Sequence, residues 1–472
     1  MKMRRYGCIL EMQARQVSEI LGISIDRNIK GIVEDIRYVE EDYLFIVRKG
    51  RNYDVFKDID EALLKGAIVL HENLQEKRGQ FIYNLKHRVH LLLEAFYKNI
   101  CTYFKIVGVC GTNGKSSVVM YLYEMMKEYR CMKIGTHFIE SCAFEWENNN
   151  TTPSEITLLH MLHLAKKHHI EYIFMEVSSH AIDEKRVSLL RFDAIIYTNI
   201  DRDHLDYHKT LLHYHQTKFK LMNYLKKNGF VIANCDESYF SKLKKVCKHP
   251  LITYGQKAAH FQIADINLSY QRSSFCINRF YFHMHLLSMM NVYNVSACIS
   301  LLRMWQISYY TLYKKVLNLN SMAGRLEVVY DRDFTVIVDY AHTSKAFYEV
   351  LHFLSSMKKN RLIVVVGCGG EREKQKRSEI GYYASHYCDI CIFSEDNSRY
   401  ESVDMIMKDM SLRVKEKAIM IREREKAIEY AIKIATNDDI ILVSGKGDEQ
   451  FISRNGEKIP FNDNSKILEL LE

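Results

Sequence analysis

A glycine-rich loop between a strand and a helix constrains this chain more than any other feature. The stretch KIVGVCGTNGKSSVVMYLYEMM begins with an apolar run typical of a buried strand, continues into GTNGKSS (111–117) and ends in an apolar-striped helix. The glycines let backbone N–H groups surround a polyphosphate, and the N-terminus of the following helix adds positive potential. This strand–loop–helix order predicts a nucleotide site.

The loop is a variant of the common phosphate-binding pattern, because Val109 stands where the first glycine of GxxxxGK[ST] would lie. Lys115 is expected to meet the β- and γ-phosphates, and the Ser116 hydroxyl to bind Mg²⁺. A simple glycine turn is the alternative, but it does not account for Lys-Ser directly after the glycine. The predicted nucleotide contacts in the loop are Gly111, Thr112, Asn113, Gly114, Lys115, Ser116 and Ser117.

Composition excludes several other classes of protein. With 47% hydrophobic and 26% charged residues the chain resembles ordinary globular proteins, which excludes disordered and collagen-like chains. The net charge of +8 suits a small polyanionic substrate at least as well as nucleic acid. Twelve cysteines in 472 residues do not form a disulfide scaffold, and reduced thiols in the cytoplasm are expected. No apolar run approaches the roughly 18 residues of a membrane span.

The pattern along the chain predicts an α/β fold with three domains, residues 1–100, 101–322 and 323–472. The first contains short strand-like runs and amphipathic helices, typical of a small α/β domain. In the second, apolar strands such as FKIVGVC and FDAIIYTNI alternate with helices, which predicts a doubly wound, mainly parallel sheet. The third has four such strands and is expected to be a second, Rossmann-like sheet.

Two side chains outside the loop follow strands of the predicted central sheet. Glu176 ends IEYIFMEV, and His204 follows FDAIIYTNI, so both are expected at the carboxyl edge that also carries the loop. A carboxylate, an imidazole and a serine hydroxyl near phosphates would form a plausible Mg²⁺ site. By itself, His204 is more simply interpreted as a hydrogen-bonded loop histidine.

The loop is one of a series of motifs that together resemble the Mur ligases, specifically the MurE-type tripeptide synthetases. The resemblance spans nearly the whole chain and implies ATP-dependent joining of an amino acid to a cell-wall precursor. The other motifs, in chain order, are NTTP (150–153), MEVSSHAI (175–182), TNIDRDHLDYH (198–208), HYHQTKFKL (213–221), NVYN (291–294), GRLE (324–327), VDYAHT (338–343), GCGGERE (367–373), DNSR (396–399) and GKGDE (445–449).

The resemblance assigns roles at the nucleotide that spacing alone does not show. Asn291 and Asn294 match the adenine side, while Arg325 and Asp339 match residues that reach the phosphates and the ribose. Lys218 matches the lysine that reacts with CO2 to become a carbamate, a carboxylate-like anion that helps to hold Mg²⁺. The implied catalytic residues are Lys115, Glu176, His204, Lys218 and Arg325, and the implied metal ligands are Ser116, Glu176, His204 and carbamylated Lys218.

The uridine-linked substrate is expected to span the first two segments. EDIRYVEEDYLFIV resembles the segment that cradles the uridine, although Ile36 replaces its serine. Glu184 stands where a glutamine is usual, and its carboxylate would repel an anionic substrate unless it is protonated or paired. The positions that match contacts to the sugar-peptide portion are Asn150, Thr151, Thr152, Ser178 and Arg186.

The third segment is expected to select the amino acid. DNSR resembles the DNPR of enzymes that add meso-diaminopimelate, and the fork of Arg399 suits the distal carboxylate of that residue. Two departures from the family pattern, Ser398 for proline and Asp448 for histidine, leave L-lysine and ornithine as alternatives. The positions that match the amino-acid site are Arg372, Asp396, Asn397, Ser398, Arg399, Gly445 and Glu449.

The expected reaction forms an acyl phosphate from the substrate carboxylate and ATP, which the amine of the incoming amino acid then attacks. The expected partners are UDP-N-acetylmuramoyl dipeptide, ATP and a free diamino acid, for a cytoplasmic monomer without nucleic-acid or membrane partners. Two alternatives keep the fold, namely a folylpolyglutamate or poly-γ-glutamate ligase and a non-catalytic ATP-binding paralogue. A GTPase is disfavoured because the chain has no guanine-reading Asn-Lys-x-Asp.

Overall fold

Three sheets and a small hairpin follow one another along the chain in the computed structural model. The structure describes residues 11–48, 54–148, 150–269, 272–320, 324–414 and 418–471. The predicted domain limit near residue 322 lies outside the described residues. The division into residues 1–100, 101–322 and 323–472 stays a prediction. No helix in the described part of the chain is both long and apolar enough to cross a bilayer.

The first sheet has four parallel strands in the order β1-β2-β3-β4. Its strands are β1 (Gly31–Val33), β2 (Tyr43–Ile46), β3 (Ile68–His71) and β4 (Gln80–Phe81). The helices of this part are α1 (Ala14–Leu21), η1 (Ile36–Tyr38), η2 (Val55–Asp58), α2 (Ile59–Leu64) and α3 (Leu85–Phe96). The short strands and the helices expected in this part are present among the described residues, and α3 packs into the same core as the central sheet.

The central sheet has eleven strands in the order β15-β14-β13-β12-β11-β10-β5-β9-β6-β7-β8. The strands from β13 to β6 are parallel, and antiparallel strands extend both edges. The strands are β5 (Lys105–Cys110), β6 (Cys131–Ile134), β7 (His137–Ser141), β8 (Glu145–Asn148), β9 (Tyr172–Glu176), β10 (Phe192–Tyr197), β11 (Leu225–Asn234), β12 (Leu251–Gly255), β13 (Phe261–Asn267), β14 (Ser273–Ile277) and β15 (Phe280–Met284).

Helices cover both faces of this sheet, as the alternation of strands and helices predicted. Successive side chains of β5 point to opposite faces, so Ile106 and Cys110 lie in one core, and Val107 and Val109 in the other. The helices are η3 (Ile100–Tyr103), α4 (Lys115–Met126), α5 (Glu155–Lys167), α6 (Ser179–Asp183), α7 (Leu205–His208), α8 (Leu211–Phe219), η4 (Lys220–Tyr224), α9 (Phe240–Val246), α10 (Met289–Met304) and α11 (Tyr309–Leu317).

The last sheet has the order β16-β17-β21-β18-β19-β20, parallel except for the edge strand β16. Its strands are β16 (Glu327–Asp331), β17 (Thr335–Asp339), β18 (Leu362–Val366), β19 (Ile390–Phe393), β20 (Ile419–Met420) and β21 (Ile440–Ser444), followed by the hairpin β22 (Phe451–Arg454) and β23 (Glu457–Pro460). Its helices are α12 (Ser344–Met357), α13 (Gln375–Tyr387), α14 (Val403–Ser411), α15 (Arg424–Ile434) and α16 (Asp463–Leu471). Helices α12, α13 and α14 pack on one face, and α15 and α16 on the other, which confirms the predicted doubly wound sheet.

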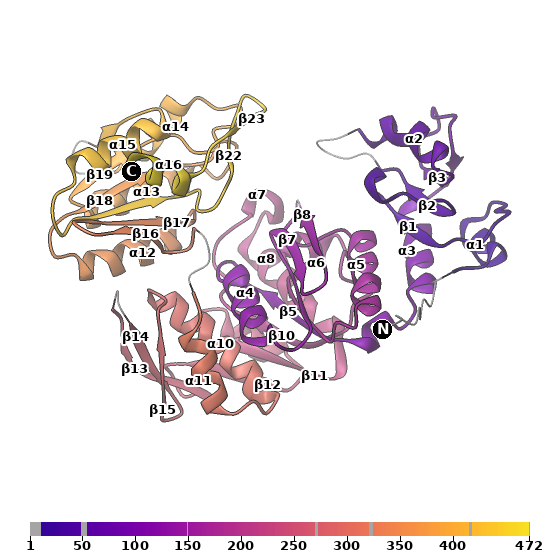
Figure 1. Ribbon diagram of the computed structural model, residues 1–472, viewed down its shortest axis with the longest axis horizontal. Helices are drawn as coiled ribbons and strands as arrows, with labels where there is room; N and C mark the ends of the chain where they lie inside the picture. The colour runs from indigo at the N-terminus through magenta and orange to yellow at the C-terminus, as the bar shows by residue number, and fades with distance from the viewer. Residues whose placement is uncertain are drawn as a thin grey trace, which may run out of the picture.

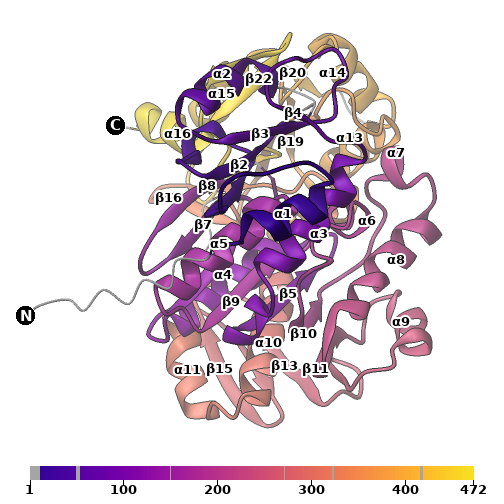
Figure 2. The same cartoon turned by 90° about the vertical axis from the view of Figure 1, so that its right-hand side faces the viewer.

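Ion pairs join the central and C-terminal parts. Figure 1 shows the C-terminal and N-terminal sheets on different sides of the central sheet, and in the turned view of Figure 2 the N-terminal sheet lies in front of part of the C-terminal one. Lys345 in α12 lies 2.9 Å from Asp201 and 3.2 Å from Glu237, and Arg202 lies 2.5 Å from Glu373. These pairs place the carboxyl end of β10 opposite the start of α12.

Helix α13 packs against α14 so closely that Gly381 allows no side chain. A Cβ at this position would lie 1.8 Å from the carbonyl oxygen of Met410, which is backbone and moves only with its helix. We therefore expect Gly381→Ala to lower the free energy of unfolding by on the order of 3 kcal/mol. Thermal and urea unfolding of the purified protein would measure this loss.

The matched control is Ser378→Ala in the same helix, because the Ser378 hydroxyl bonds to the Gln375 carbonyl within α13. We expect this control to change stability little. Equal stability of the Gly381 variant and the control would show that α13 and α14 pack less closely than described.

Candidate active site between the central and C-terminal sheets

A cavity of about 260 Å³ lies where the carboxyl ends of central strands face the start of the C-terminal sheet. It brings together predicted residues from segments more than two hundred positions apart in the sequence. The predicted residues that line it are Thr112, Asn113, Gly114, Lys115, Ser116, Ser117, Thr151, Glu176, His204, Asn291, Asn294, Arg325, Asp339 and Arg372.

The phosphate loop has the backbone geometry that the glycines predicted. A Cβ on Gly111 would lie 1.8 Å from the Thr198 hydroxyl oxygen, so the turn after β5 requires glycine. Gly114 has φ +80°, in the left-handed region, and caps α4. Lys115 folds back over the loop, and its Nζ donates to the carbonyls of Gly111 at 3.0 Å and Thr112 at 2.8 Å. Burial and the nearby Lys218 ammonium lower the pKa of Lys115.

Glu176 lies beside the phosphate loop at the end of β9. One carboxylate oxygen accepts a hydrogen bond from the Ser116 hydroxyl at 2.9 Å, and the other accepts from the Thr136 backbone N–H at 2.9 Å. Its side chain is buried. Parallel pairing of β5 with β9 places Val109 opposite Glu176, and this register explains why residues sixty positions apart meet. The serine and the carboxylate thus lie at the same sheet edge, where the sequence placed them, and the hydrogen bond between them comes from the structure.

His204 lies on the same cavity in a left-handed conformation, with φ +52°. Its Nε2 is 3.4 Å from an oxygen of Asp203, and its ring packs edge-on against His180. Burial lowers the pKa of His204 to about 4. The imidazole is therefore neutral near pH 7 and has a lone pair for a metal ion or a hydrogen-bond donor.

The predicted metal ligands fit a sparse Mg²⁺ site better than an all-protein cage. In the described part of the chain no three His, Cys, Asp or Glu side chains converge as metal ligands. Ser116, Glu176 and His204 nevertheless line one cavity. Mg²⁺ commonly takes one or two carboxylates together with substrate phosphates and water, and this set of donors meets that requirement.

Lys218 lies in α8, behind the cavity lining rather than in it. Only 1% of the residue is exposed, and its Nζ lies 4.4 Å from the centre of the Tyr214 ring. No ion pair to its ammonium occurs among the described residues. Burial lowers the pKa of Lys218 to about 8, so a substantial fraction of the side chain is the neutral amine near that pH. The usual expectation for a lysine in a helix, a solvated surface charge, is wrong here.

The adenine-side asparagines differ in how their amides are already bonded. Asn291 accepts from the Tyr121 hydroxyl at 2.9 Å and donates to the Leu287 carbonyl at 2.7 Å, which holds its amide in place. Asn294 lies directly against Gly114 of the phosphate loop, since a Cβ on that glycine would come within 2.5 Å of the Asn294 Oδ1. Helix α10 therefore packs directly against the phosphate loop at Gly114.

Arg325 and Asp339 bring the C-terminal part to the phosphate loop. The Arg325 guanidinium stacks on Tyr340 at 4.1 Å from the ring centre. Asp339 accepts from the backbone N–H groups of Leu326 and Ala341 at 2.8 and 2.7 Å. Burial raises its pKa, and the Arg325 charge opposes that shift. Because Arg325 and Lys115 line one cavity, the predicted approach of the arginine to the loop is present in this arrangement.

A second cavity of about 450 Å³ adjoins the first and shares Asn113, Gly114 and Asn294 with it. The two cavities also share Ser288 and Met290, and the walls of the second alone, between α10 and α12, include Tyr254, Tyr348 and Phe353. Apolar and aromatic walls beside a phosphate loop suit the base of a nucleotide.

The residues predicted to hold the sugar-peptide portion lie around the end of β9. The Thr152 hydroxyl donates to the Glu176 carbonyl at 2.9 Å and accepts from the Ser178 N–H at 3.1 Å. Arg186 binds the Thr152 carbonyl at 2.9 Å and forms an ion pair with Glu184 at 2.6 Å. The carboxylate of Glu184, which was expected to repel an anionic substrate unless protonated or paired, is therefore paired with Arg186.

Two further predicted substrate positions lie at the edges of this region. Thr151 accepts from the Thr136 hydroxyl at 3.2 Å and lines the cavity, while Asn150 is exposed and bonds through its backbone to Asn148. Ile36 lies in η1 and packs against the small core of the N-terminal part. Its apolar side chain is thus used in packing rather than in a polar contact.

The predicted amino-acid site contains two neighbouring guanidinium groups. Arg372 lines the cavity, and Arg399 donates to the Gly370 carbonyl. Burial and the charge of Arg372 lower the pKa of Arg399. Among the described residues neither arginine has an ion pair with a carboxylate. The two guanidinium groups thus give this region positive charge, which the nearby carboxylates of Glu371, Asp396 and Glu449 offset in part.

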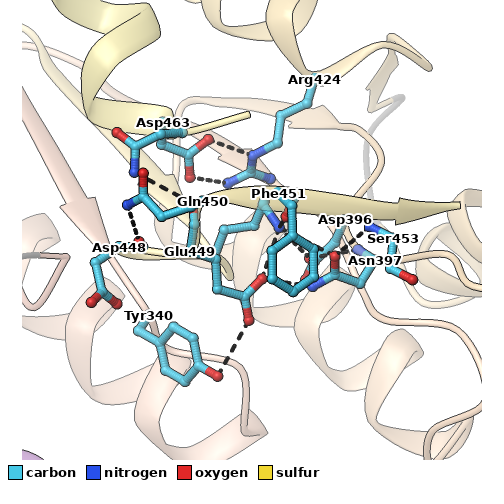
Figure 3. Close-up of polar contacts among 12 residues, drawn as sticks. Tyr340, Asp396, Asn397, Arg424, Asp448, Glu449, Gln450, Phe451, Ser453 and Asp463 are labelled. Carbon is cyan, nitrogen blue, oxygen red and sulfur yellow. Dashed lines mark hydrogen bonds and ion pairs between the residues drawn. The ribbon is translucent and has the colours of Figure 1, made fainter. Parts of the chain in front are cut away.

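The other predicted amino-acid residues form a bonded cluster next to Tyr340 (Figure 3). The Asn397 amide donates to Glu449 at 2.6 Å, and the Tyr340 hydroxyl donates to the second oxygen of Glu449 at 3.5 Å. Gly445 has φ +113°, and a Cβ there would lie 3.4 Å from the Asp396 carboxylate. The Ser398 side chain is buried, and its hydroxyl oxygen has no hydrogen-bond partner in the described residues.

Several residues of the cavity were not assigned from the sequence. Tyr340 and His342 line it and belong to VDYAHT, so the motif itself was the available signal. Asp448 also lines the cavity, where it replaces the usual histidine. Lys446 is completely buried beside Glu449, and no sequence signal separates such a lysine from a surface one.

Comparison with known proteins identifies the family. Residues 109–302 match the Mur ligase middle domain, and residues 324–447 match the Mur ligase glutamate ligase domain. The chain belongs to the Mur ligase family. The resemblance predicted from the motifs is thereby confirmed, together with an enzyme of the ATP-dependent ligase class.

This Mur ligase is similar to two curated relatives, each named UDP-N-acetylmuramoyl-L-alanyl-D-glutamate–2,6-diaminopimelate ligase. The one from Fusobacterium nucleatum is 33% identical, with 93% of both chains covered, and the one from Aquifex aeolicus is 32% identical, with 94% of both covered. A solved structure with the same name is 27% identical over 96% of this chain and 98% of that chain, with a TM-score of 0.63. A MurF ligase from Thermotoga maritima in complex with ADP, 17% identical with 93% and 96% of the chains covered, shares the fold at a TM-score of 0.70.

The position of Lys115 in the loop of this Mur ligase predicts that it dominates nucleotide binding. We expect Lys115→Ala to weaken ATP binding at least about tenfold, because a charge-assisted contact to phosphate is lost. Calorimetric titration of the purified protein with ATP and Mg²⁺ would measure the change.

The matched control is Lys127→Ala just after α4, because that side chain is 60% exposed and pairs with Glu124 on the surface. We expect ordinary ATP affinity for this control. Ordinary affinity in the Lys115 variant as well would mean that ATP binds elsewhere.

Proposed function

We propose that this enzyme adds meso-diaminopimelate to UDP-N-acetylmuramoyl-L-alanyl-D-glutamate in an ATP-dependent step of peptidoglycan synthesis. The observation that carries the proposal is the shared cavity, in which Lys115, Arg325 and Arg372 come from three different segments. A phosphate-binding loop and an unpaired arginine of the amino-acid site thus open into one space. This arrangement suits transfer of an activated carboxyl group to an amine. The names of the relatives supply the identity of the substrates.

In the first step, the substrate carboxylate attacks the γ-phosphate of ATP, and an acyl phosphate and ADP form. Lys115 and Arg325 neutralise charge on the phosphates, which matters because catalysis of phosphoryl transfer rests mainly on positioning and electrostatics. Ser116, Glu176 and His204 would hold Mg²⁺, which supplies further charge neutralisation at the phosphates when bound. The amine then attacks the acyl carbon and expels inorganic phosphate, so that an amide bond forms.

Lys218 is proposed to act as a carbamate. Carbamylation joins the neutral amine to CO2 and releases a proton, so it requires the unprotonated form of the side chain. The lowered pKa of Lys218, about 8, makes that form available near neutral pH. The resulting anion would also remove the positive charge of Lys218 that helps to lower the pKa of Lys115 in the present arrangement. Burial behind the cavity would protect the carbamate from loss of CO2.

The proposed selection of meso-diaminopimelate rests on Arg372 and Arg399, which have no direct ion pair among the described residues. Its distal end carries both an ammonium and a carboxylate, whereas L-lysine ends in an ammonium alone. Within the described residues Arg399 and Arg372 form no direct ion pair with a carboxylate, and Glu371, Asp396 and Glu449 offset the charge of Arg399 only in part, since its pKa stays lowered. A distal carboxylate would satisfy them, and an ammonium would be repelled.

One experiment tests substrate and reaction together. The enzyme is given ATP, Mg²⁺ and the muramoyl dipeptide, with diaminopimelate, L-lysine or ornithine as the third substrate, and the products are identified by mass spectrometry. We expect the diaminopimelate product in clear excess. Preference for L-lysine or ornithine would overturn the amino-acid assignment, and ATP binding without any product would indicate a non-catalytic paralogue.

Arg399 provides a direct test of the specificity proposal. Arg399→Ala leaves the distal carboxylate without its charge partner, so kcat/KM for diaminopimelate should fall at least about tenfold. Any activity on L-lysine should fall much less, because lysine lacks that carboxylate. Steady-state kinetics with both amino acids would measure the two changes.

Arg413→Ala is the matched control, since this arginine is exposed and packs over Tyr382 on the surface of the same part. We expect ordinary kinetics for it. An equal loss on both amino acids in the Arg399 variant would contradict recognition of the distal carboxylate.

Lys218 provides the test of carbamylation. We expect Lys218→Ala to lose most activity and to regain part of it with added acetate or formate, because a small carboxylate can occupy the place of the carbamate. Wild-type activity should also fall when bicarbonate is removed below pH 8, where the amine becomes increasingly protonated. Initial rates across this series would measure each effect.

Lys220→Ala is the control, because Lys220 is the exposed neighbour of Lys218 at the end of α8. Ordinary rates in the Lys218 variant and no response to bicarbonate would show that the lysine is not used as a carbamate.

A further inference from the structure

A completely buried lysine lies behind the predicted amino-acid site, and it has no role in the reaction proposed above. Lys446 stands between two glycines of the loop after β21, and none of its side chain is exposed. Burying an ammonium is costly unless acceptors surround it. Most of the groups that surround this one belong to the predicted amino-acid site, namely Asp396, Asn397 and Glu449.

All three donors of the Lys446 ammonium have an acceptor. Its Nζ lies 2.8 Å from a carboxylate oxygen of Glu449, 2.8 Å from the Phe451 carbonyl and 3.4 Å from the Asn397 amide oxygen. It also lies 3.7 Å from the Asp396 carboxylate. Burial alone would raise the pKa of Asp396, but the charges of Lys446 and Arg424 outweigh it and lower that pKa.

The same contacts determine which way the Asn397 amide faces. Its oxygen accepts from two donors, Lys446 and the Ser453 backbone N–H at 2.8 Å. Because donors occupy that side, the NH₂ group must face the other way, where it donates to Glu449 at 2.6 Å. A flipped amide would place its NH₂ against two donors and its oxygen against a carboxylate. Figure 3 shows Asn397, Glu449, Phe451 and Ser453 gathered around this point.

Glu449 is left with one oxygen toward the substrate side. Lys446 and Asn397 both bind its Oε2, whereas within the described residues the contact of Oε1 is a long one of 3.5 Å with Tyr340, a residue of the cavity lining. Without Lys446 the carboxylate would lose the cation that holds Oε2 and could rotate away from the cavity. The orientation of Glu449 therefore depends on the buried lysine.

We propose that Lys446 is a positioning residue for the amino-acid substrate. It holds Glu449 with Oε1 directed at the ammonium group of that substrate, and it sets the direction of the Asn397 amide. The inference rests on the proposed function, because it takes Asn397 and Glu449 to contact the amino acid. It adds a residue that touches no substrate and acts through both of them.

The test compares Lys446→Met and Lys446→Arg with the wild-type enzyme in steady-state kinetics, with each of the three substrates varied in turn. We expect Lys446→Met to raise the KM for diaminopimelate at least about tenfold, with the KM values for ATP and the muramoyl dipeptide within about twofold of wild type. Lys446→Arg keeps the positive charge and should recover part of the loss.

Arg361→Met is the matched control for lost stability. Arg361 forms a 2.6 Å ion pair with Asp439 at the amino ends of β18 and β21, the opposite edge of the same sheet. This control should lower the unfolding temperature without changing the KM for any substrate.

Two kinds of result overturn the inference. An unchanged KM for diaminopimelate in Lys446→Met does so, and so does a parallel change in all three KM values, which would indicate general loss of structure. If Lys446→Met does not fold, the test uses Lys446→Arg by itself. A KM raised only for the amino acid then supports the inference, and unchanged KM values for all three substrates overturn it. Failure of the wild type to use diaminopimelate would instead overturn the proposed function, and the KM comparison would then be made with the amino acid that is used.

Discussion

The site depends on the meeting of two parallel sheets at their carboxyl ends. β5 and β9 of the central sheet deliver the phosphate loop and Glu176, while β17 of the C-terminal sheet ends at Asp339. In a parallel sheet all strands end at one edge, so each sheet gathers its loops there. Lys345, which pairs with Asp201 and Glu237, joins the two edges across the chain. A single cavity then has walls from both sheets.

The buried lysines and arginines around this site differ in the groups that surround their positive charges. Lys218 is buried without an ion pair to a carboxylate among the described residues, so burial lowers its pKa to about 8. Lys446 is equally buried but surrounded by acceptors, so it holds Glu449 and Asn397 in place. Arg399 has a carbonyl partner but no ion pair with a carboxylate among the described residues, and we propose that it binds a substrate anion. The neighbours of each cation, rather than its residue type, determine its chemistry.

Where the chain departs from its family, the structure gives physical consequences for some positions. Glu184 replaces a glutamine but is neutralised by Arg186, so the site gains no free negative charge there. Ile36 replaces a serine and packs into a core. Asp448 replaces a histidine and adds a carboxylate to the cavity lining. Nothing in the structure explains Ser398, whose buried hydroxyl has no partner in the described residues.

The sequence by itself determined the sheets, the phosphate loop and the family, because apolar periodicity and glycine spacing are local properties of the chain. Glu176 could be placed at the sheet edge for the same reason, since it ends a strand. Only the tertiary structure decided that Glu176 accepts from Ser116, that Arg186 pairs with Glu184, and that Lys446 is buried. These three features depend on which strands are neighbours in the sheet and on how deeply packing buries the charged groups. A stretch of a few residues determines neither the strand order nor the burial.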